Sequence, residues 1–219
     1  IRSALAFIYG TDFSWVQVLP EWLRNIPGYS NKTKMDYGFD FEKIATERFT
    51  PQRFFDELRG IADASGVDYT TLLKINLFPE LTRAICTILG VWGPASADGN
   101  LYHLRALDYL PQAFFNNLAA VIIYHPTEPG SQQFANLGWV GMVGSLAGYN
   151  GHVGIGEKAW VNNRDTTTTI FGEPWMFVVR DVVQFATDID SAIDILQKAN
   201  RTYNIRLGVA VQRRIINLE

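Results

Sequence analysis

One cysteine and two charged residues near the middle of the chain are the candidates for chemistry. Cys86 is the only cysteine among 219 residues, and Arg105 and Asp108 follow it in the next alternating run. A thiol beside a guanidinium can act as an activated nucleophile, because the cation stabilises the thiolate. The alternative is a small buried core residue, since free cysteine in an apolar run is usually buried.

A predicted β-hairpin brings these residues together. Residues 86–92 are rich in β-formers, residues 93–100 are dense in turn formers, and residues 101–107 alternate again. The start of the first strand then lies beside the end of the second. Residues three apart on a straight strand face opposite ways, so Arg105 and Asp108 can both reach the thiol only if the strand bends or ends there.

Three stretches of the sequence resemble the N-terminal-nucleophile hydrolases. Cys86-Thr87, followed by His-Leu-Arg-Ala-Leu-Asp-Tyr at 103–109, is similar to the isopenicillin N acyltransferase-like family and its relatives, the acid ceramidases, N-acylethanolamine amidases and bile salt hydrolases. Residues 55–76 are similar to the pro-segment helices of the acyltransferase-like group. Residues 138–150 and 153–157 are similar to its next core strands.

The resemblance implies a role for each candidate. A precursor of this kind cuts its own chain before the nucleophile, here between Ile85 and Cys86. The freed α-amine, whose pKa is about 7.7–8, can accept the thiol proton near neutral pH. Arg105 would lie beside the thiolate or hold a substrate oxygen, and Asp108 would orient the new amine. Glu157 would support Arg105 through a carboxylate–guanidinium bridge.

The sequence identifies the oxyanion hole and the roles of the histidines less directly than it identifies the nucleophile. Backbone amides near Gly156 are oxyanion candidates, with the Asn150 side chain as a weak substitute. The N-terminal amine makes a catalytic histidine unnecessary, so three histidines are interpreted as structural: His103, His125 and His152. The sequence also departs from the family, because 104–106 read Leu-Arg-Ala where many members carry Gly-Arg-Asn, and no cysteine precedes Cys86 to form the inter-subunit disulfide of ceramidases.

Composition narrows the function classes. A net charge of −3 without a Lys/Arg cluster argues against a nucleic-acid partner, and no apolar run is long enough to span a bilayer. Neither a cofactor nor a metal site is expected. The sequence starts at Ile1 rather than Met, which is typical of a mature form, and two sequons begin at Asn31 and Asn200. Together these features predict a lysosomal or secreted glycoprotein.

Hydrophobic periodicity predicts an α+β fold. A strand buried on both faces is expected at 118–124. The other expected elements are a loop at 31–38, helices at 51–65 (ended by Gly66), 68–78, 174–186 and from Asp188 or Asp190 to 199, and strands at 134–143, 152–161 and 203–211.

The resemblance sharpens this prediction to the αββα four-layer sandwich of N-terminal-nucleophile hydrolases. Residues 1–85 would be a helical pro-segment and residues 86–219 the start of the catalytic subunit, within one domain. Because family members continue with more strands, we expect a second subunit or a missing C-terminal segment to complete a sheet. The aromatic segment at 4–29 either packs on the domain or meets lipid.

The leading functional hypothesis is a self-processing amidase. It would hydrolyse a non-peptide amide C–N bond of an N-acyl substrate through an acyl-enzyme on Cys86. The apolar N-terminal segment favours a fatty-acyl amide such as a ceramide or N-acylethanolamine, and an acyltransferase would use the same intermediate. Two alternatives stay open: a phospholipase B-like esterase of the same fold, and a catalytically silent lipid- or partner-binding domain in which the Ile85–Cys86 bond stays intact.

Overall fold

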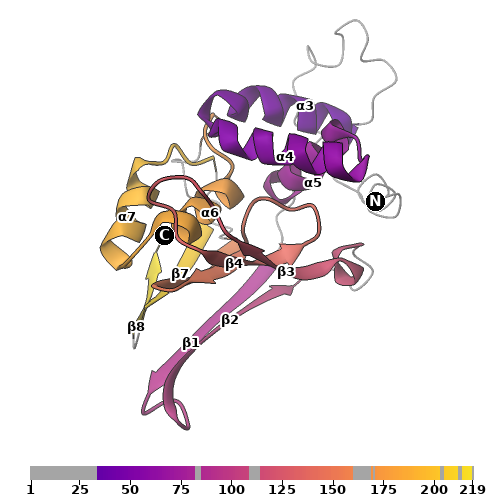
Figure 1. Cartoon of the computed structure of the whole chain (residues 1–219). Coiled ribbons are helices and arrows are strands. Elements are labelled where there is room, and N and C mark those ends of the chain that lie inside the picture. Colours follow the sequence, from indigo (N-terminus) through magenta and orange to yellow (C-terminus); the bar gives the residue numbers. More distant parts are fainter. Residues whose placement is uncertain are drawn as a thin grey trace, which may run out of the picture.

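Helices and strands occur in separate blocks, which confirms the predicted α+β class (Figure 1). The computed structural model describes residues 34–81, 85–108, 114–159, 169, 171–202, 205–211 and 214–218. The aromatic segment at 4–29 lies outside these residues, as does Asn31.

A helical block precedes Cys86. It consists of α3 (Lys34–Thr46), the short 3₁₀ helix η2 (Glu47–Phe49), α4 (Gln52–Ser65) and α5 (Tyr69–Leu81). Gly66 ends α4 in the left-handed conformation at φ 70°, as predicted. Two expectations were wrong: residues 34–38 belong to α3 rather than to a loop, and α5 continues through Pro79 beyond the predicted end at 78.

The predicted hairpin is present and forms a two-stranded antiparallel sheet. Strand β1 (Ile85–Gly93) pairs with β2 (Gly99–Asp108), so that Cys86 is the register partner of Leu107 and Ile88 that of Arg105. The ladder is regular from Ile85 to Val91, and its one irregularity lies near the turn.

A second sheet has six antiparallel strands in the order β3-β4-β5-β6-β7-β8. A short 3₁₀ helix, η3 (Phe114–Asn117), precedes it. The strands are β3 (Ala119–Tyr124), β4 (Phe134–Trp139), β5 (Ala147–Asn150), β6 (Val153–Ala159), β7 (Ile205–Val211) and β8 (Arg214–Leu218). The prediction for 118–124 was wrong in its position: β3 lies at the sheet edge and is alternately exposed, because an apolar run does not show what covers it.

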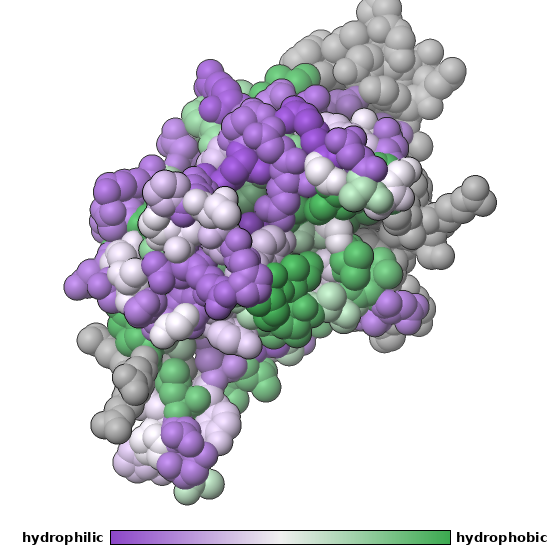
Figure 2. Space-filling model, in the orientation of Figure 1, coloured by the Kyte–Doolittle hydropathy of each residue, from purple (hydrophilic) through white to green (hydrophobic). Residues whose placement is uncertain are grey.

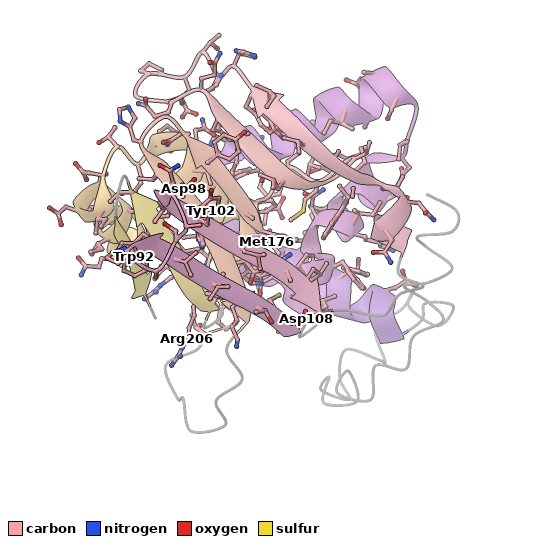
Figure 3. The ribbon with its side chains drawn as sticks, turned by 90° about the horizontal axis from the view of Figure 1, so that it is seen from below. Trp92, Asp98, Tyr102, Asp108, Met176 and Arg206 are labelled. Carbon is pink, nitrogen blue, oxygen red and sulfur yellow. The ribbon has the colours of Figure 1, made fainter. Side chains whose placement is uncertain are left out.

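The six-stranded sheet separates two different layers. Helices α6 (Trp175–Phe185) and α7 (Ile189–Lys198) pack on one face, close to the predicted bounds. The hairpin packs on the other face, over β6 and β7 (Figures 1 and 3). The order helix, sheet, sheet therefore accounts for three of the four expected layers within the part of the chain that the structure describes.

One hydrophobic core joins the segments before and after Cys86. Phe54 of α4 stacks on Phe177 of α6 with ring centroids 4.4 Å apart. Buried Asn76 of α5 donates to the Gly141 carbonyl at 2.8 Å and accepts from the Val143 amide at 2.8 Å. The helical block is therefore an integral part of the fold.

No described element covers part of the hairpin-facing side of the large sheet, next to β3 and β4. Its exposed apolar side chains include Val121, which is 59% exposed, Ile123, Leu137 and Tyr149. Figure 2 shows hydrophobic residues gathered around β3 and β4, below the α4 and α5 helices. The outer face of the hairpin is also apolar, with Leu89, Tyr102 and Leu104 exposed. Among the described residues no helix is long and apolar enough to cross a membrane.

Candidate active site

The hairpin and the end of β6 bring Cys86, Arg105 and Glu157 together. The Arg105 guanidinium donates from Nη2 to Cys86 Sγ at 3.0 Å and also pairs with Glu157 Oε1. The thiol donates to the same carboxylate oxygen at 3.6 Å. Arg105 Nε reaches the Glu157 carbonyl at 3.4 Å, so the guanidinium is held at two points. Each of the three side chains therefore contacts the other two.

Burial makes this set electrostatically sensitive. Cys86 is 2% exposed, and the Glu157 and Arg105 side chains are 2% and 10% exposed. Desolvation raises the pKa of Glu157, while the Arg105 charge and the hydrogen bonds from Arg105 and Cys86 oppose that rise. Its second oxygen, Oε2, has no hydrogen-bond partner within the described residues. Glu157 is therefore a carboxylate with capacity to take up a proton.

Asp108 does not join this cluster. It is exposed, and its Oδ2 accepts a hydrogen bond from Thr87 Oγ1 at 2.8 Å. The regular ladder places Asp108 opposite Ile85, at the bond expected to be cut, but with its side chain on the other face from Arg105. The bend that would bring both residues to the thiol is absent from the described strand. Figure 3 shows Asp108 at the end of the hairpin away from Trp92.

The two oxyanion candidates have other tasks in the uncut chain. Asn150 Nδ2 donates to the carbonyls of Val183 and Ala186, and its Oδ1 accepts from the amides of His152 and Val153. That side chain therefore joins β5 to α6 and does not point a free donor at the thiol. Gly156 lies in a strand paired on both sides, so its amide faces a neighbouring strand.

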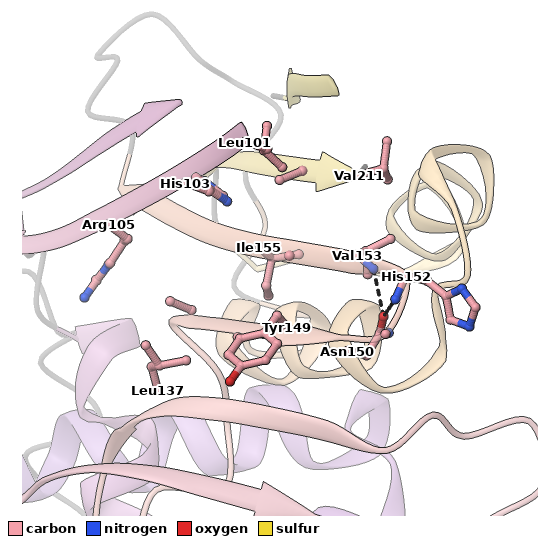
Figure 4. A pocket seen from close by; sticks show the side chains of 15 residues that line it. Leu101, His103, Arg105, Leu137, Tyr149, Asn150, His152, Val153, Ile155 and Val211 are labelled. Atoms are coloured by element: carbon pink, nitrogen blue, oxygen red, sulfur yellow. Dashed lines mark hydrogen bonds between the residues drawn. The ribbon is translucent and has the colours of Figure 1, made fainter. Parts of the chain in front are cut away.

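A cavity of about 590 Å³ lies between β2 and the uncovered part of the large sheet (Figure 4). Arg105 and His103 line it from β2, and both apolar and polar residues line the rest, including Leu101, Leu137, Tyr149 and Asn150. Cys86 is not among the lining residues. Arg105 is therefore the residue that both lines the cavity and contacts the thiol.

The remaining predicted residues are spread over the molecule. His125 and His152 are exposed, and His103 is half-buried, with burial lowering its pKa. Asn200 is exposed, and Thr202 of its sequon is buried against Glu80. The described residues contain no group of three or more His, Cys, Asp or Glu placed to hold a metal ion.

Two features of the site were not foreseen from the sequence. The hydroxyl of Thr87 holds Asp108, and a glycine of β7, Gly208, faces His103. The alternation of glycine with Val153 and Ile155 along β6 is the visible signal for a close approach on that face. Its partner on β7 could be identified only once the strand register was known.

Taken together, the chain is an α+β protein with a buried thiol–guanidinium–carboxylate site. No family model matches it. It is 39% identical to protein dcd1A of Dictyostelium discoideum over 225 residues, which cover 95% of this chain and 51% of that protein. It is 38% identical to protein dcd1B of the same organism over 191 residues, covering 87% of this chain and 37% of the relative.

More distant matches carry the name of an enzyme. The mouse N-acylethanolamine-hydrolyzing acid amidase is 26% identical over 205 residues, covering 90% of this chain and 50% of the amidase. A solved structure of a Caenorhabditis elegans ortholog of that amidase matches with a TM-score of 0.43 and 16% identity, covering 61% of this chain and 64% of that one. The chain spans about half the length, or less, of these curated relatives. The sequence similarity supports the superfamily indicated by the Cys86 motif.

Proposed function

We propose that this chain is part of a self-processing cysteine amidase of the N-terminal-nucleophile type, which hydrolyses the amide C–N bond of an N-acyl substrate. The observation that carries this proposal is the buried contact of Cys86 Sγ with Arg105 Nη2 at 3.0 Å and with Glu157 Oε1 at 3.6 Å. A cation favours the thiolate, and an adjacent carboxylate can receive its proton. The distant similarity to acid amidases supports the choice of an amide bond.

The first reaction is cleavage of the Ile85–Cys86 bond. In the uncut chain the nitrogen of Cys86 is an amide and cannot act as a base, so Glu157 is the carboxylate placed to take the thiol proton. The sulfur attacks the Ile85 carbonyl carbon, the C–N bond breaks, and the nitrogen gains a proton to become the α-amine. Water then hydrolyses the thioester, which leaves a carboxylate on Ile85 and a free thiol on Cys86.

In turnover the same thiol attacks the substrate carbonyl. The α-amine now accepts the thiol proton and passes it to the departing amine of the substrate, which leaves an acyl-enzyme for water to hydrolyse. Arg105 stabilises the thiolate or the developing oxyanion. Asp108, opposite Ile85 in the ladder, is close enough along the strand to orient the new amine after the chain end moves.

The cavity supports a fatty-acyl amide as the substrate class. Leu101 and Leu137 contribute apolar side chains to its lining, and Arg105 lies beside them. An acyl chain would lie along these side chains while its carbonyl reaches the guanidinium. A hydrolysis assay with N-acylethanolamines and ceramides of different chain lengths tests this substrate class.

Self-cleavage is the first experiment. Purified protein is incubated at pH 4.5 and at pH 7.5 and followed by intact mass and N-terminal sequencing. We expect a fragment beginning Cys-Thr-Ile-Leu, which disappears completely in Cys86→Ala. Leu89→Ala is the matched control, because Leu89 lies on β1 with a side chain that is 55% exposed. A chain that stays whole under every condition would instead indicate a silent binding domain.

A further strand-bearing segment is proposed to complete the hairpin layer. One edge of β2 is unpaired among the described strands, and the cavity beside it opens on the exposed side chains of Leu137 and Tyr149. Strands added to that edge would cover the apolar surface and roof the cavity. Co-purification of an additional fragment with the Cys86-containing one tests this.

A lysosomal or secreted location is the corresponding proposal for localisation. It is supported by the two sequons, of which Asn200 is exposed, and by the distant similarity to acid amidases. The electrophoretic mobility of Asn31→Gln and Asn200→Gln variants, before and after enzymatic deglycosylation, tests glycosylation at each site.

A further inference from the structure

Two glycines on neighbouring strands form a surface without side chains, on which the hairpin packs; we call this surface the seat. Gly156 of β6 and Gly208 of β7 are register partners. A Cβ atom on Gly208 would lie 2.9 Å from His103 Nε2, and one on Gly156 would lie 3.2 Å from the same atom. Neither glycine has a positive φ, so the missing side chain, and not the backbone conformation, is what the site requires.

The seat extends from His103 to the reactive cluster. A Cβ atom on Gly156 would lie 3.1 Å from Arg105 Cβ and 3.2 Å from Ile88 Cγ2. Because His103 and Arg105 are two residues apart on β2, they share one face of that strand. The imidazole therefore rests on the same strip of backbone that fixes where the Arg105 side chain starts (Figure 4).

The neighbouring position on the same strand shows that this closeness is local. A Cβ atom on Gly154 would have its nearest neighbours at 3.8 Å, which is an ordinary contact distance. Alanine therefore fits at Gly154 without any adjustment, whereas at Gly208 the His103 imidazole must shift to make room for it. The close approach of the sheet to the hairpin is therefore found under Gly156 and Gly208 and not under Gly154.

We propose that His103 is a positioning residue whose imidazole, seated on the Gly156–Gly208 pair, sets the separation of β2 from the large sheet at which Arg105 reaches Cys86 and Glu157. Burial lowers the pKa of His103, which favours the neutral form of the ring beside Arg105. The catalytic consequence rests on the proposed function, whereas the effect on the thiol does not.

The test widens the gap by adding one methyl group. Gly208→Ala displaces the imidazole, which on this proposal moves β2 outward, and Gly154→Ala is the matched control. Thiolate absorbance at 240 nm, measured as a difference from Cys86→Ser, follows the single thiol as the pH is raised. We expect the thiol of Gly208→Ala to ionise at a higher pH than that of the unaltered protein, and self-cleavage to slow by at least about tenfold. Gly154→Ala should leave both measurements unchanged within about twofold.

A compensating substitution separates positioning from simple damage. In Gly208→Ala combined with His103→Ala, the smaller side chain makes room for the added methyl group. We expect this double variant to cleave faster and to ionise at a lower pH than Gly208→Ala alone. A double variant that shows the summed defects of the two single variants overturns the proposal.

Two further measurements keep the test decisive. Thermal unfolding of each variant detects a general loss of stability, and Gly208→Ala with a lower Tm but an unaltered thiol titration would also overturn the proposal. If the protein never cleaves itself, the thiol titration still decides the role of His103, so failure of the proposed function and failure of this inference are distinguishable.

Discussion

The two faces of the six-stranded sheet are built from the same strands in opposite ways. Along β6 the branched residues Val153 and Ile155 are buried in the core, whereas Gly154 and Gly156 alternate with them under the hairpin. β7 repeats the pattern, with Leu207 and Val209 against Gly208 and Ala210. On β6 and β7, the helix-covered face is therefore filled by branched side chains, whereas the hairpin-covered face permits close backbone approach. Substitutions on the first should therefore change stability, and substitutions on the second should change the thiol.

The largest effect is expected on the helix-covered side. Phe177→Ala removes a fully buried ring stacked on Phe54 and should lower the free energy of unfolding by about 3–5 kcal/mol. Urea denaturation measures this loss, with Phe171→Ala as the matched control because Phe171 is half exposed. Titration of the thiol in the folded variant should be unaltered. A shifted titration would mean that the two faces are coupled.

Arg105→Met tests the hairpin-covered side. Burial already raises the pKa of Glu157, and removing the guanidinium raises it further. The substitution therefore costs no folding stability below the ordinary Glu157 pKa of 4.5. The loss of stability appears as the pH rises towards the pKa of Glu157 in the folded variant, and it is complete above that pKa. We expect the variant to be about 2–3 kcal/mol less stable than the unaltered protein at pH 8, because one partner of a buried ion pair is lost. At pH 4.5 the two proteins should be nearly equally stable.

The control for this variant is Arg59→Met, which removes an exposed Arg59–Asp56 pair. It should change stability by less than about 1 kcal/mol at either pH. Equal pH profiles for Arg105→Met and the unaltered protein would contradict a buried charge on Glu157. Loss of self-cleavage in Arg105→Met, together with retained folding at pH 4.5, would assign the guanidinium to chemistry.

Glu80 provides an exception on the helix side, where a charge also matters. It accepts hydrogen bonds from the Trp175 amide and Thr202 Oγ1, both at 2.6 Å, and desolvation raises its pKa to about 7. Its contribution is therefore favourable at acidic pH and is lost as the pH rises from 4.5 through 7. Glu80→Gln should flatten this decline by about 1–2 kcal/mol, measured as unfolding free energy at pH 5 and pH 8. The exposed Glu47→Gln should keep the original slope.

The smallest effect is expected where the hairpin-facing side is uncovered. Val121→Thr replaces an exposed side chain on an edge strand and should change the unfolding free energy by less than about 0.5 kcal/mol. A larger loss, observed only when an additional fragment co-purifies, would locate the completing strands over β3. Thermal unfolding with and without that fragment makes the comparison.

Local sequence patterns predicted the helices and strands, whereas the orientation of several site residues depends on tertiary contacts. The hairpin and α7, with its Asp188 capping box, follow from turn formers, caps and periodicity. The contact between Arg105 and Glu157 was implied by the family resemblance, since 52 positions separate them. The orientation of Asp108 and the four hydrogen bonds of Asn150 depend on strand register and on α6, which no local pattern encodes.

The core shared across Cys86 changes the thermodynamics of the protein once that bond is cut. Phe54 and Asn76 precede the break, and their partners Phe177 and Val143 follow it. The proposed cut would therefore turn one chain into two fragments that share one hydrophobic core. The melting temperature of the cut protein should rise with protein concentration, as for any obligate dimer, whereas that of the uncut chain should not. Refolding of the two fragments after denaturation would then be second order in protein concentration, whereas refolding of the uncut chain would be first order.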